Sequence, residues 1–502
     1  MFSVQDTFGM QTFRSAQHGK SPSRPRSAPR PLAQRGQALV WLLGTLAASV
    51  AVLYGVYSTG QISAQKQRVI NAADTAALAG AAVEARVLNL MAYNNRAMIA
   101  NEVFMIQTVA MQGWFQYLKT TSDNVEDYVK WIPYAGPYLS KVLTTFSKIS
   151  AQVEKLLDKF IPVQVKALEL MKTGYSASHK VLREGTSVIA DSAAADVVNA
   201  NRTQFAAHTD AGMQVDGRTA VKLATTAKNW NAWRGFSRQY SGNDRGDAAG
   251  VLKASRDEFT RGSRPGAGWM NIDLGLTGFD KLGDTQLVNF DRWETQDTYE
   301  FWIYGFDTCE KLEWAKCYER VGWGRGNLDK SKSSGGVWNP GRDAQNSARN
   351  DGHRAGKWSG VPSVYDLSNR NSNQRETLGV DFLVAVKRDQ ANTLTTDTLG
   401  LGRPTTSVAG SPQMDERLLA RQLSSLGKAR VFFERPASNV GDHTASSLLR
   451  HDSAKEFGSL FSPYWQARLT DVSTTDKTAY MVALGMDPLS AATLSNFTPG
   501  GQ

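Results

Sequence analysis

The chain has 502 residues, of which 41% are hydrophobic and 21% are charged, and its formal net charge is +10. This length allows more than one domain with a sizeable core, and the composition excludes a chain that is disordered throughout. The two cysteines and six histidines are scattered, which excludes the locally paired ligands of a structural zinc site. We therefore predict neither a metal nor a cofactor.

Residues 1–35 form a basic tail rich in proline, serine and arginine, a composition that predicts disorder. A basic tail can bind nucleic acid, but beside a membrane span it sets the orientation of that span. We favour the second interpretation and predict no nucleic-acid partner.

Residues 36–60 contain no charged side chain and predict a transmembrane helix. Their central run, "ALVWLLGTLAASVAVLYGVY", has the ~20 apolar residues that a helix needs to cross a bilayer. Trp41 and Tyr57 lie near its ends, where aromatic rings favour the membrane interface. Because the basic tail precedes the span, we expect a cytoplasmic N-terminus and an extracytoplasmic bulk. A cleaved signal peptide and a buried core helix are the alternatives.

Residues 61–117 lack proline and are dominated by good helix formers, so we expect the helix to continue beyond the membrane. Its first part, "QKQRVINAADTAALAGA", repeats small residues every four positions. Such rows let a neighbouring helix backbone approach closely. The alternative is a helix that is rich in alanine only because alanine is the best helix former. The residues that we predict to make the packing contact are Ala73, Asp74, Ala77, Gly80 and Ala81.

The span led by "RGQALVWLLG" and followed by "QKQRVINAADTAALAGAA" resembles the N-terminal region of the TadE/TadG-like family of tight-adherence (Tad, Flp-type) pilus proteins. The residues that carry the resemblance are Gln67, Asn71, Ala72, Ala73, Asp74, Ala76, Ala77, Leu78, Ala79 and Gly80. The resemblance implies a minor pilin-like structural or assembly component of the bacterial inner membrane, without enzymatic activity. Its partners would be other Tad pilus or secretion-machinery subunits.

The sequence departs from the processed members of that family. Prepilin peptidases cut after a glycine and favour glutamate at the fifth mature position, whereas a cut after Gly36 would place Trp41 there. The resemblance therefore favours the uncleaved, TadG-like branch.

Residues 121–135 predict a turn, and the residues that follow predict one or two amphipathic helices that Pro162 breaks or kinks. With the alanine-rich helix they would form a helical stem or hairpin over residues 61–234. Apolar residues recur there at spacings of three and four, at Leu139, Val142, Leu143, Phe146, Ile149 and Val153. We expect this stripe to pack internally, with a groove for a partner as the alternative.

Residues 235–495 are richer in glycine, aspartate and aromatic residues and predict a distal domain that contains strands. Strand-like runs occupy residues 298–306, 378–388, 429–436 and 464–472. The basic, glycine-rich segment 322–360 predicts a flexible loop. The expected fold class is thus α+β: a transmembrane helix, a long helical stem or hairpin, and an extracytoplasmic domain with strands.

The two cysteines, Cys309 and Cys317, both lie in the part expected outside the cytoplasm, where disulfides persist. We predict a bridge between them, with two buried thiols as the alternative.

Three short motifs resemble ligand sites but fit them poorly. "GWGRG" at 322–326 lacks the full spacing of a phosphate loop and a following helix. "DVSTTD" at 471–476 departs from the DxSxS metal loop. The aspartates of 273–284 have the spacing of turn residues and do not match a calcium loop.

Two other function classes remain open from the sequence. An anchored cell-envelope hydrolase would need a cluster of titratable residues, and His353 is expected as a lone exposed histidine. A module that binds cell-wall polymer or another surface ligand would use the basic loop with Trp338 and Trp358.

Overall fold

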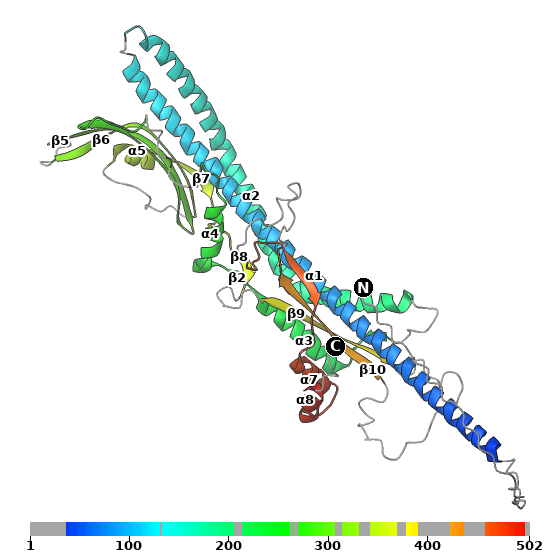
Figure 1. Ribbon diagram of the computed structural model, residues 1–502. Helices are drawn as coiled ribbons and strands as arrows, with labels where there is room; N and C mark the ends of the chain where they lie inside the picture. Colours follow the sequence, from blue (N-terminus) through cyan, green and yellow to red (C-terminus); the bar gives the residue numbers. More distant parts are fainter. Residues whose placement is uncertain are drawn as a thin grey trace, which may run out of the picture. The chain divides into compact units, whose positions relative to one another are not determined.

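The computed structural model describes residues 37–130, 133–204, 213–261, 264, 270–306, 314–330, 342–368, 378–389, 422–435 and 457–496 (Figure 1). It has two compact units, Met1–Gln61 and Ile62–Gln502. The larger unit combines long helices with three sheets, so the α+β class is confirmed. The basic tail of residues 1–35 lies outside the described residues.

Helix α1 (Gln37–Val129) is 93 residues long. Its beginning presents large apolar side chains, and Leu39, Trp41 and Leu53 are each more than half exposed. Among the described residues, α1 is the one helix that is long and apolar enough to cross a membrane. The turn expected from residue 121 begins only after Val129, where α1 ends. Residues after 121 continue the helix, and Asn124 still bonds the backbone of Val321.

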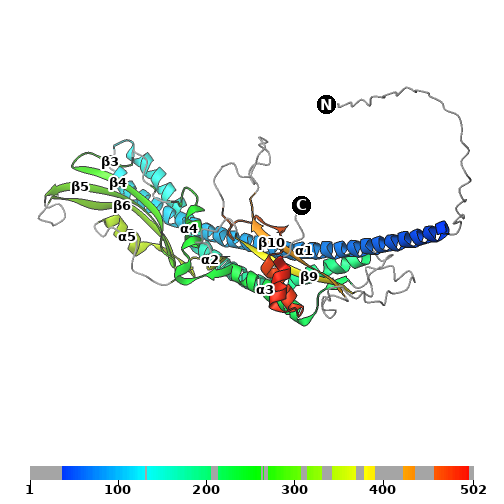
Figure 2. The ribbon, with the colours of Figure 1, turned by 60° about the horizontal axis from the view of Figure 1, so that its bottom comes forward.

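Helix α2 (Gly136–Gln204) runs antiparallel to α1, and the two form a long hairpin (Figures 1 and 2). The break expected at Pro162 is wrong, because the helix continues through this residue. A proline inside a helix costs about 3 kcal/mol or more. The neighbouring side chains of Ile161 and Val165 are buried in a hydrophobic cluster, and their packing offsets that cost.

The first sheet has the order β1-β9-β10-β11 and is antiparallel throughout. Its strands are β1 (Met213–Val215), β9 (Gly379–Asp389), β10 (Gln422–Phe433) and β11 (Trp465–Leu469). Helix α3 (Thr219–Phe236) packs on β9, and α1 also contacts this strand through Gly80 and Phe382. Strand β9 is buried on both faces, since Leu383 and Ala385 are as inaccessible as Phe382 and Val384.

The second sheet has the order β3-β4-β5-β6-β7, and its last pair is parallel. Its strands are β3 (Ile272–Asp273), β4 (Thr277–Asn289), β5 (Arg292–Phe306), β6 (Trp314–Asp329) and β7 (His353–Lys357). Helix α5 (Asp343–Asp351) packs against β6 and β5. The flexible loop expected at 322–360 is therefore wrong for most of its length, because this segment contains the end of β6, α5 and β7.

Short elements complete the larger unit. They are the paired strands β2 (Ser237–Tyr240) and β8 (Val364–Leu367), the 3-10 helix η1 (Gly242–Asp244), and helices α4 (Gly246–Ala254), α7 (Thr474–Ala483) and α8 (Pro488–Asn496). The four strand-like runs of the sequence correspond to β5, β9, β10 and β11, which confirms those strands. The stem and the distal strands belong to the same compact unit, Ile62–Gln502.

Candidate functional site

The alanine row of α1 lies on the first sheet. Ala73, Ala77 and Ala81 have no exposed surface, and they share one hydrophobic cluster with residues of β9 and β10. The sequence predicted close packing against a neighbouring helix. The structure places two strands of the same chain over this row, and Ala190, Ala194 and Val198 of helix α2 belong to the same cluster.

Two glycines show how closely the backbones approach. A Cβ at Gly80 would lie 2.1 Å from Cε1 of Phe382, so the ring of that residue rests against the helix backbone. On the strand side, a Cβ at Gly427 would lie 2.2 Å from the carbonyl oxygen of Ala73. Small residues are thus required on both sides of this contact.

Two acids belong to the same helix segment. Asp74 is partly exposed, and desolvation raises the pKa of its carboxyl. Glu84 is fully buried, and its carboxyl oxygens have no hydrogen-bond partner among the described residues. Burial raises the pKa of Glu84 well above its usual range, and the charges of Asp191 and Asp381 add to this effect. No local pattern marks this buried acid, because Glu84 looks like an ordinary surface residue of a helix in the sequence.

A second stretch of α1 lies on strand β6 of the second sheet. The glycines of "GWGRG" face the helix: a Cβ at Gly324 would lie 2.0 Å from the carbonyl oxygen of Gly113, and one at Gly326 would lie 2.3 Å from that of Val109. This motif is therefore neither a phosphate loop nor a flexible loop. It is a strand whose alternate glycines admit a helix backbone.

Side chains of α1 also hydrogen-bond the backbone of β6. The Thr120 hydroxyl accepts from the Trp323 N–H at 2.8 Å and donates to the Trp323 carbonyl at 2.6 Å. The side-chain amide oxygen of Gln116 accepts from the backbone N–H of Arg325 at 2.9 Å, and the side-chain amide of Asn124 donates to the Val321 carbonyl at 2.8 Å. Four helix residues advance about 6.0 Å and two strand residues about 6.6 Å, so the helix and the strand stay in step.

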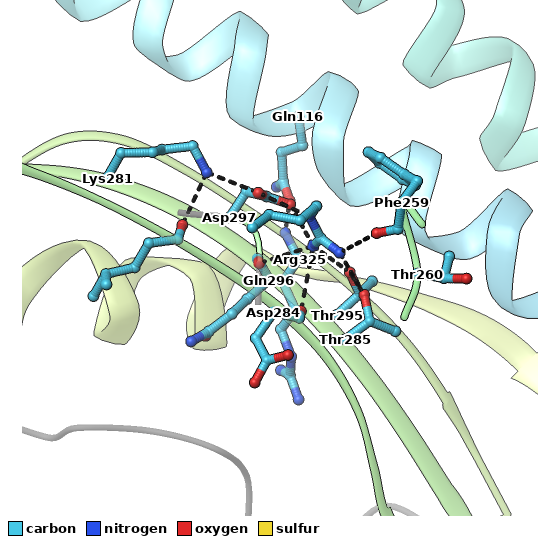
Figure 3. Close-up of polar contacts among 12 residues, drawn as sticks. Gln116, Phe259, Thr260, Lys281, Asp284, Thr285, Thr295, Gln296, Asp297 and Arg325 are labelled. Atoms are coloured by element: carbon cyan, nitrogen blue, oxygen red, sulfur yellow. Dashed lines mark hydrogen bonds and ion pairs between the residues drawn. The ribbon is translucent and has the colours of Figure 1, made fainter. Parts of the chain in front are cut away.

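A buried ion cluster in the second sheet lies beside this contact (Figure 3). Asp297 accepts from Lys281 at 2.8 Å and from Arg264 at 2.7 Å. The Lys281 ammonium lies 4.5 Å from the ring centre of Tyr117 on α1. Burial lowers the pKa of Lys281, and Asp297 opposes that shift. Two cations share the Asp297 carboxylate, and the contact of Lys281 with Tyr117 joins the cluster to α1.

The two helices of the hairpin contact each other through both apolar and polar side chains: Met98 of α1 and Ile161 of α2 share one hydrophobic cluster, and Ala77 and Ala194 share the other. The hydrogen-bonded pairs are Asp123–Ser147, Gln112–Asp158, Thr108–Gln164, Glu102–Lys172 and Asn94–Ser178. Burial raises the pKa of Glu102 to about 6, against the lowering effect of Lys172. Trp358 donates to the same carboxylate at 2.7 Å and is 1% exposed. The expectation that Trp358 lies on a basic, exposed loop is therefore wrong.

His353 is not the lone exposed histidine that the sequence predicted. Its Nε2 lies 2.6 Å from Glu154 and its Nδ1 lies 3.0 Å from Asp158, both on α2. Burial disfavours the charged ring, but the hydrogen bond to Glu154 and the two carboxylate charges outweigh it and raise the pKa of His353. Because both ring nitrogens are engaged, this histidine is held as a structural cation between α2 and β7.

The other motifs also have structural roles. Ser473 caps α7 by accepting from the Asp476 N–H, and the Asp476 carboxylate pairs with Lys228 and Lys428. Asp273 accepts from the N–H of Gly275, whose φ of 88° marks a tight turn. In the described part of the chain, no group of three or more histidine, cysteine, aspartate or glutamate side chains is placed to hold a metal.

Cys317 in β6 is disulfide-bonded. The only other cysteine of the sequence is Cys309, which lies outside the described residues. The Cys309–Cys317 pairing stays a prediction, and the bonded state of Cys317 fits it.

Comparison with known proteins gives one match. Residues 36–83 match a family model described as putative Flp pilus-assembly TadE/G-like. No curated protein and no solved structure matches the chain. The matched residues contain both the exposed apolar beginning of α1 and the alanine row. The resemblance seen in the sequence is thereby confirmed for residues 36–83, which are a TadE/G-like segment.

Proposed function

We propose that this protein is a membrane-anchored structural or assembly component of a Tad-type pilus, of the uncleaved TadG-like kind. The observation that carries the proposal is the position of the family match, which joins the apolar beginning of α1 to the alanine row. The apolar segment would hold the chain in the inner membrane, with the N-terminus in the cytoplasm. The other Tad subunits are the expected partners.

The larger unit would lie outside the cytoplasm. The disulfide at Cys317 supports this placement, because disulfides persist in oxidising compartments and are rare in the cytosol. The sequence supports the same orientation, since the basic tail precedes the apolar segment.

The alanine row would act within the chain. It holds the first sheet on α1, so a partner helix could reach Ala73 or Ala77 only by displacing β9 and β10. Contacts with other subunits would therefore use surfaces other than this row.

Fractionation of sheared cells tests the proposal. A C-terminal tag is followed in released pili and in the cell envelope, and piliation is counted in a deletion strain. Tag in the pili means a minor subunit, and tag in the envelope with lost piliation means an assembly factor. Tag in the envelope with normal piliation would contradict the proposal.

A further inference from the structure

The outward side of α2 carries an apolar seam with a heptad period. Counting residue 139 as position a, the a and d positions through residue 170 are Leu139, Val142, Phe146, Ile149, Val153, Leu156, Phe160, Val163, Ala167 and Leu170. We name this set the α2 seam. Val153 is half-buried and the others are exposed, Leu156 by 66% and Leu170 by 74%. The internal packing expected for this stripe is therefore wrong for most of its residues.

The seam is too long and too regular for a chance surface feature. At 1.5 Å per residue it extends roughly 46 Å along the helix. An apolar repeat of 3.5 residues is the pattern that seats one helix against another in coiled coils. Monomeric proteins rarely leave so large a contiguous apolar patch exposed.

The seam is not the interface of the hairpin itself. The side of α2 that faces α1 is lined by buried polar residues such as Ser147, Gln164 and Lys172. Buried polar side chains thus line the inside of the hairpin together with apolar ones such as Ile161 and Val165, and the apolar heptads lie outside it. Apolar residues of α2 therefore face both inward and outward, whereas an ordinary amphipathic helix places its apolar side inward.

The charges beside the seam have one sign. The exposed lysines beside it are Lys159 and Lys166 at g positions and Lys141, Lys148 and Lys155 at the neighbouring c positions. The carboxylates of the same span turn elsewhere: Glu154 and Asp158 bind His353, and Glu169 binds Lys172. The seam is therefore an apolar strip with one basic edge, because its e positions, Leu143, Ser150, Leu157 and Gln164, carry no charge.

We propose that the α2 seam docks an amphipathic helix of another protein, with apolar a and d positions and acidic flanks. Such a helix would lie along the hairpin as a third strand of a helical bundle. An acidic flank would pair with Lys159 and Lys166 at the g positions, and charges at e and g set partner choice in coiled coils. A second copy of α2 would bring lysines against lysines. A membrane surface would suit a broader apolar face than this narrow seam.

Binding of designed peptides to the full-length protein in lipid nanodiscs tests the proposal. One peptide of four heptads has leucine at a and d and glutamate at e and g, and a second has lysine at e and g. Fluorescence anisotropy should show at least tenfold tighter binding of the glutamate peptide, weakening as salt screens the charges. Equal binding of both peptides, or no binding, would overturn the proposal.

Two sets of variants locate the site. Ile149→Glu with Leu156→Glu should abolish binding of the glutamate peptide, whereas Leu489→Glu, at an equally exposed leucine of α8, should leave it unchanged. Lys159→Glu with Lys166→Glu keeps the apolar strip and should reverse the preference toward the lysine peptide. Binding that survives both double substitutions would place the peptide elsewhere and contradict the proposal.

The two rival occupants give different results. Dimerisation of the protein that Ile149→Glu abolishes and that excludes the peptide would identify a second copy. Loss of peptide binding only in anionic nanodiscs would identify the membrane surface. Either result overturns the proposal. The peptide assay does not depend on piliation, so its failure leaves the proposed pilus function standing, and the reverse also holds.

Discussion

Helix α1 packs on two sheets of the same chain, and small residues predominate on a different side of each contact. On the first sheet most of the small residues belong to the helix, where Ala77 shares a cluster with the larger Phe382 and Val384, and Gly427 is the exception on the strands. On the second sheet the strand is small, because Gly322, Gly324 and Gly326 lie under the helix. In both contacts one of the two surfaces carries mostly small residues, so that the backbones of the helix and the strand can approach each other.

In both contacts a polar side chain of α1 also hydrogen-bonds the backbone of a strand. In the first, the Asn89 amide pairs with both the N–H and the carbonyl of Trp465, at 2.9 and 3.0 Å. In the second, Thr120 does the same with Trp323. Each side chain satisfies buried backbone groups at an edge, where an unpaired group would be costly. A helix can thus replace a missing strand at a sheet edge.

The largest expected loss of stability comes from adding a side chain to a glycine of β6 that lies under α1. Gly324→Val should lower the free energy of unfolding by about 3 kcal/mol, because its Cβ would overlap backbone atoms of α1 that cannot move aside. Chemical denaturation of the full-length protein in detergent, followed by tryptophan fluorescence, measures this. Gly250→Ala in α4 is the control, since its Cβ meets open space. Wild-type stability of Gly324→Val would mean that α1 does not lie on β6.

Enlarging an alanine of α1 under the first sheet should lower the stability somewhat less. Ala77→Leu should cost about 2 kcal/mol, since it overpacks the cluster beneath β9 and β10. The same denaturation assay measures the loss, with Thr75→Leu at an exposed position of the same helix as control. If Ala77→Leu blocked piliation while unfolding like the wild type, the row would contact another subunit after all.

A buried histidine that packs on α1 between the two contacts should make the free energy of unfolding depend on pH. His179 of α2 donates from Nε2 to the Met91 carbonyl at 3.1 Å, and burial lowers its pKa to about 4. The native state then binds fewer protons than the unfolded state, so this contribution is full above the unfolded pKa of about 6.5 and is lost as pH falls toward 4. Between pH 7.5 and pH 5 the loss should be about 2 kcal/mol.

Comparison with His179→Gln isolates that effect, because the buried Glu102 is common to both proteins and shifts stability in the opposite direction. Denaturation curves at the two pH values should show a steeper loss for the wild type. Parallel losses in the two proteins would mean that His179 is not buried as a neutral ring.

The smallest loss of stability should come from removing one of these hydrogen bonds between α1 and a strand. Thr120→Val keeps the shape of the side chain but leaves the Trp323 N–H without its acceptor, which should cost about 1–2 kcal/mol. Thr173→Val on α2 is the matched control, because that hydroxyl is exposed and bonds only its own helix. Equal stability of the two variants would show that water replaces Thr120 at the strand edge.

Local pattern predicted much of the fold. The apolar run, the absence of proline and the four-residue repeat of alanine predicted the beginning and course of α1, and alternation predicted β9. The "GWGRG" motif was misinterpreted as loop, because glycine within a strand weakens its local signal. Its signal was the period of two, which places Gly322, Gly324 and Gly326 on one face of a strand.

The sequence by itself determined the family segment, the anchor helix, the α+β class and the small-residue row, since each depends on residues that are neighbours along the chain. Tertiary structure decided what covers the row, which side of α2 faces α1, and which charges are paired. Those outcomes depend on contacts between residues such as Asn89 and Trp465, hundreds of positions apart. The heptad of α2 was visible in the sequence. That it faces outward follows only from the polar and apolar residues on the other side of α2, which are buried in the hairpin.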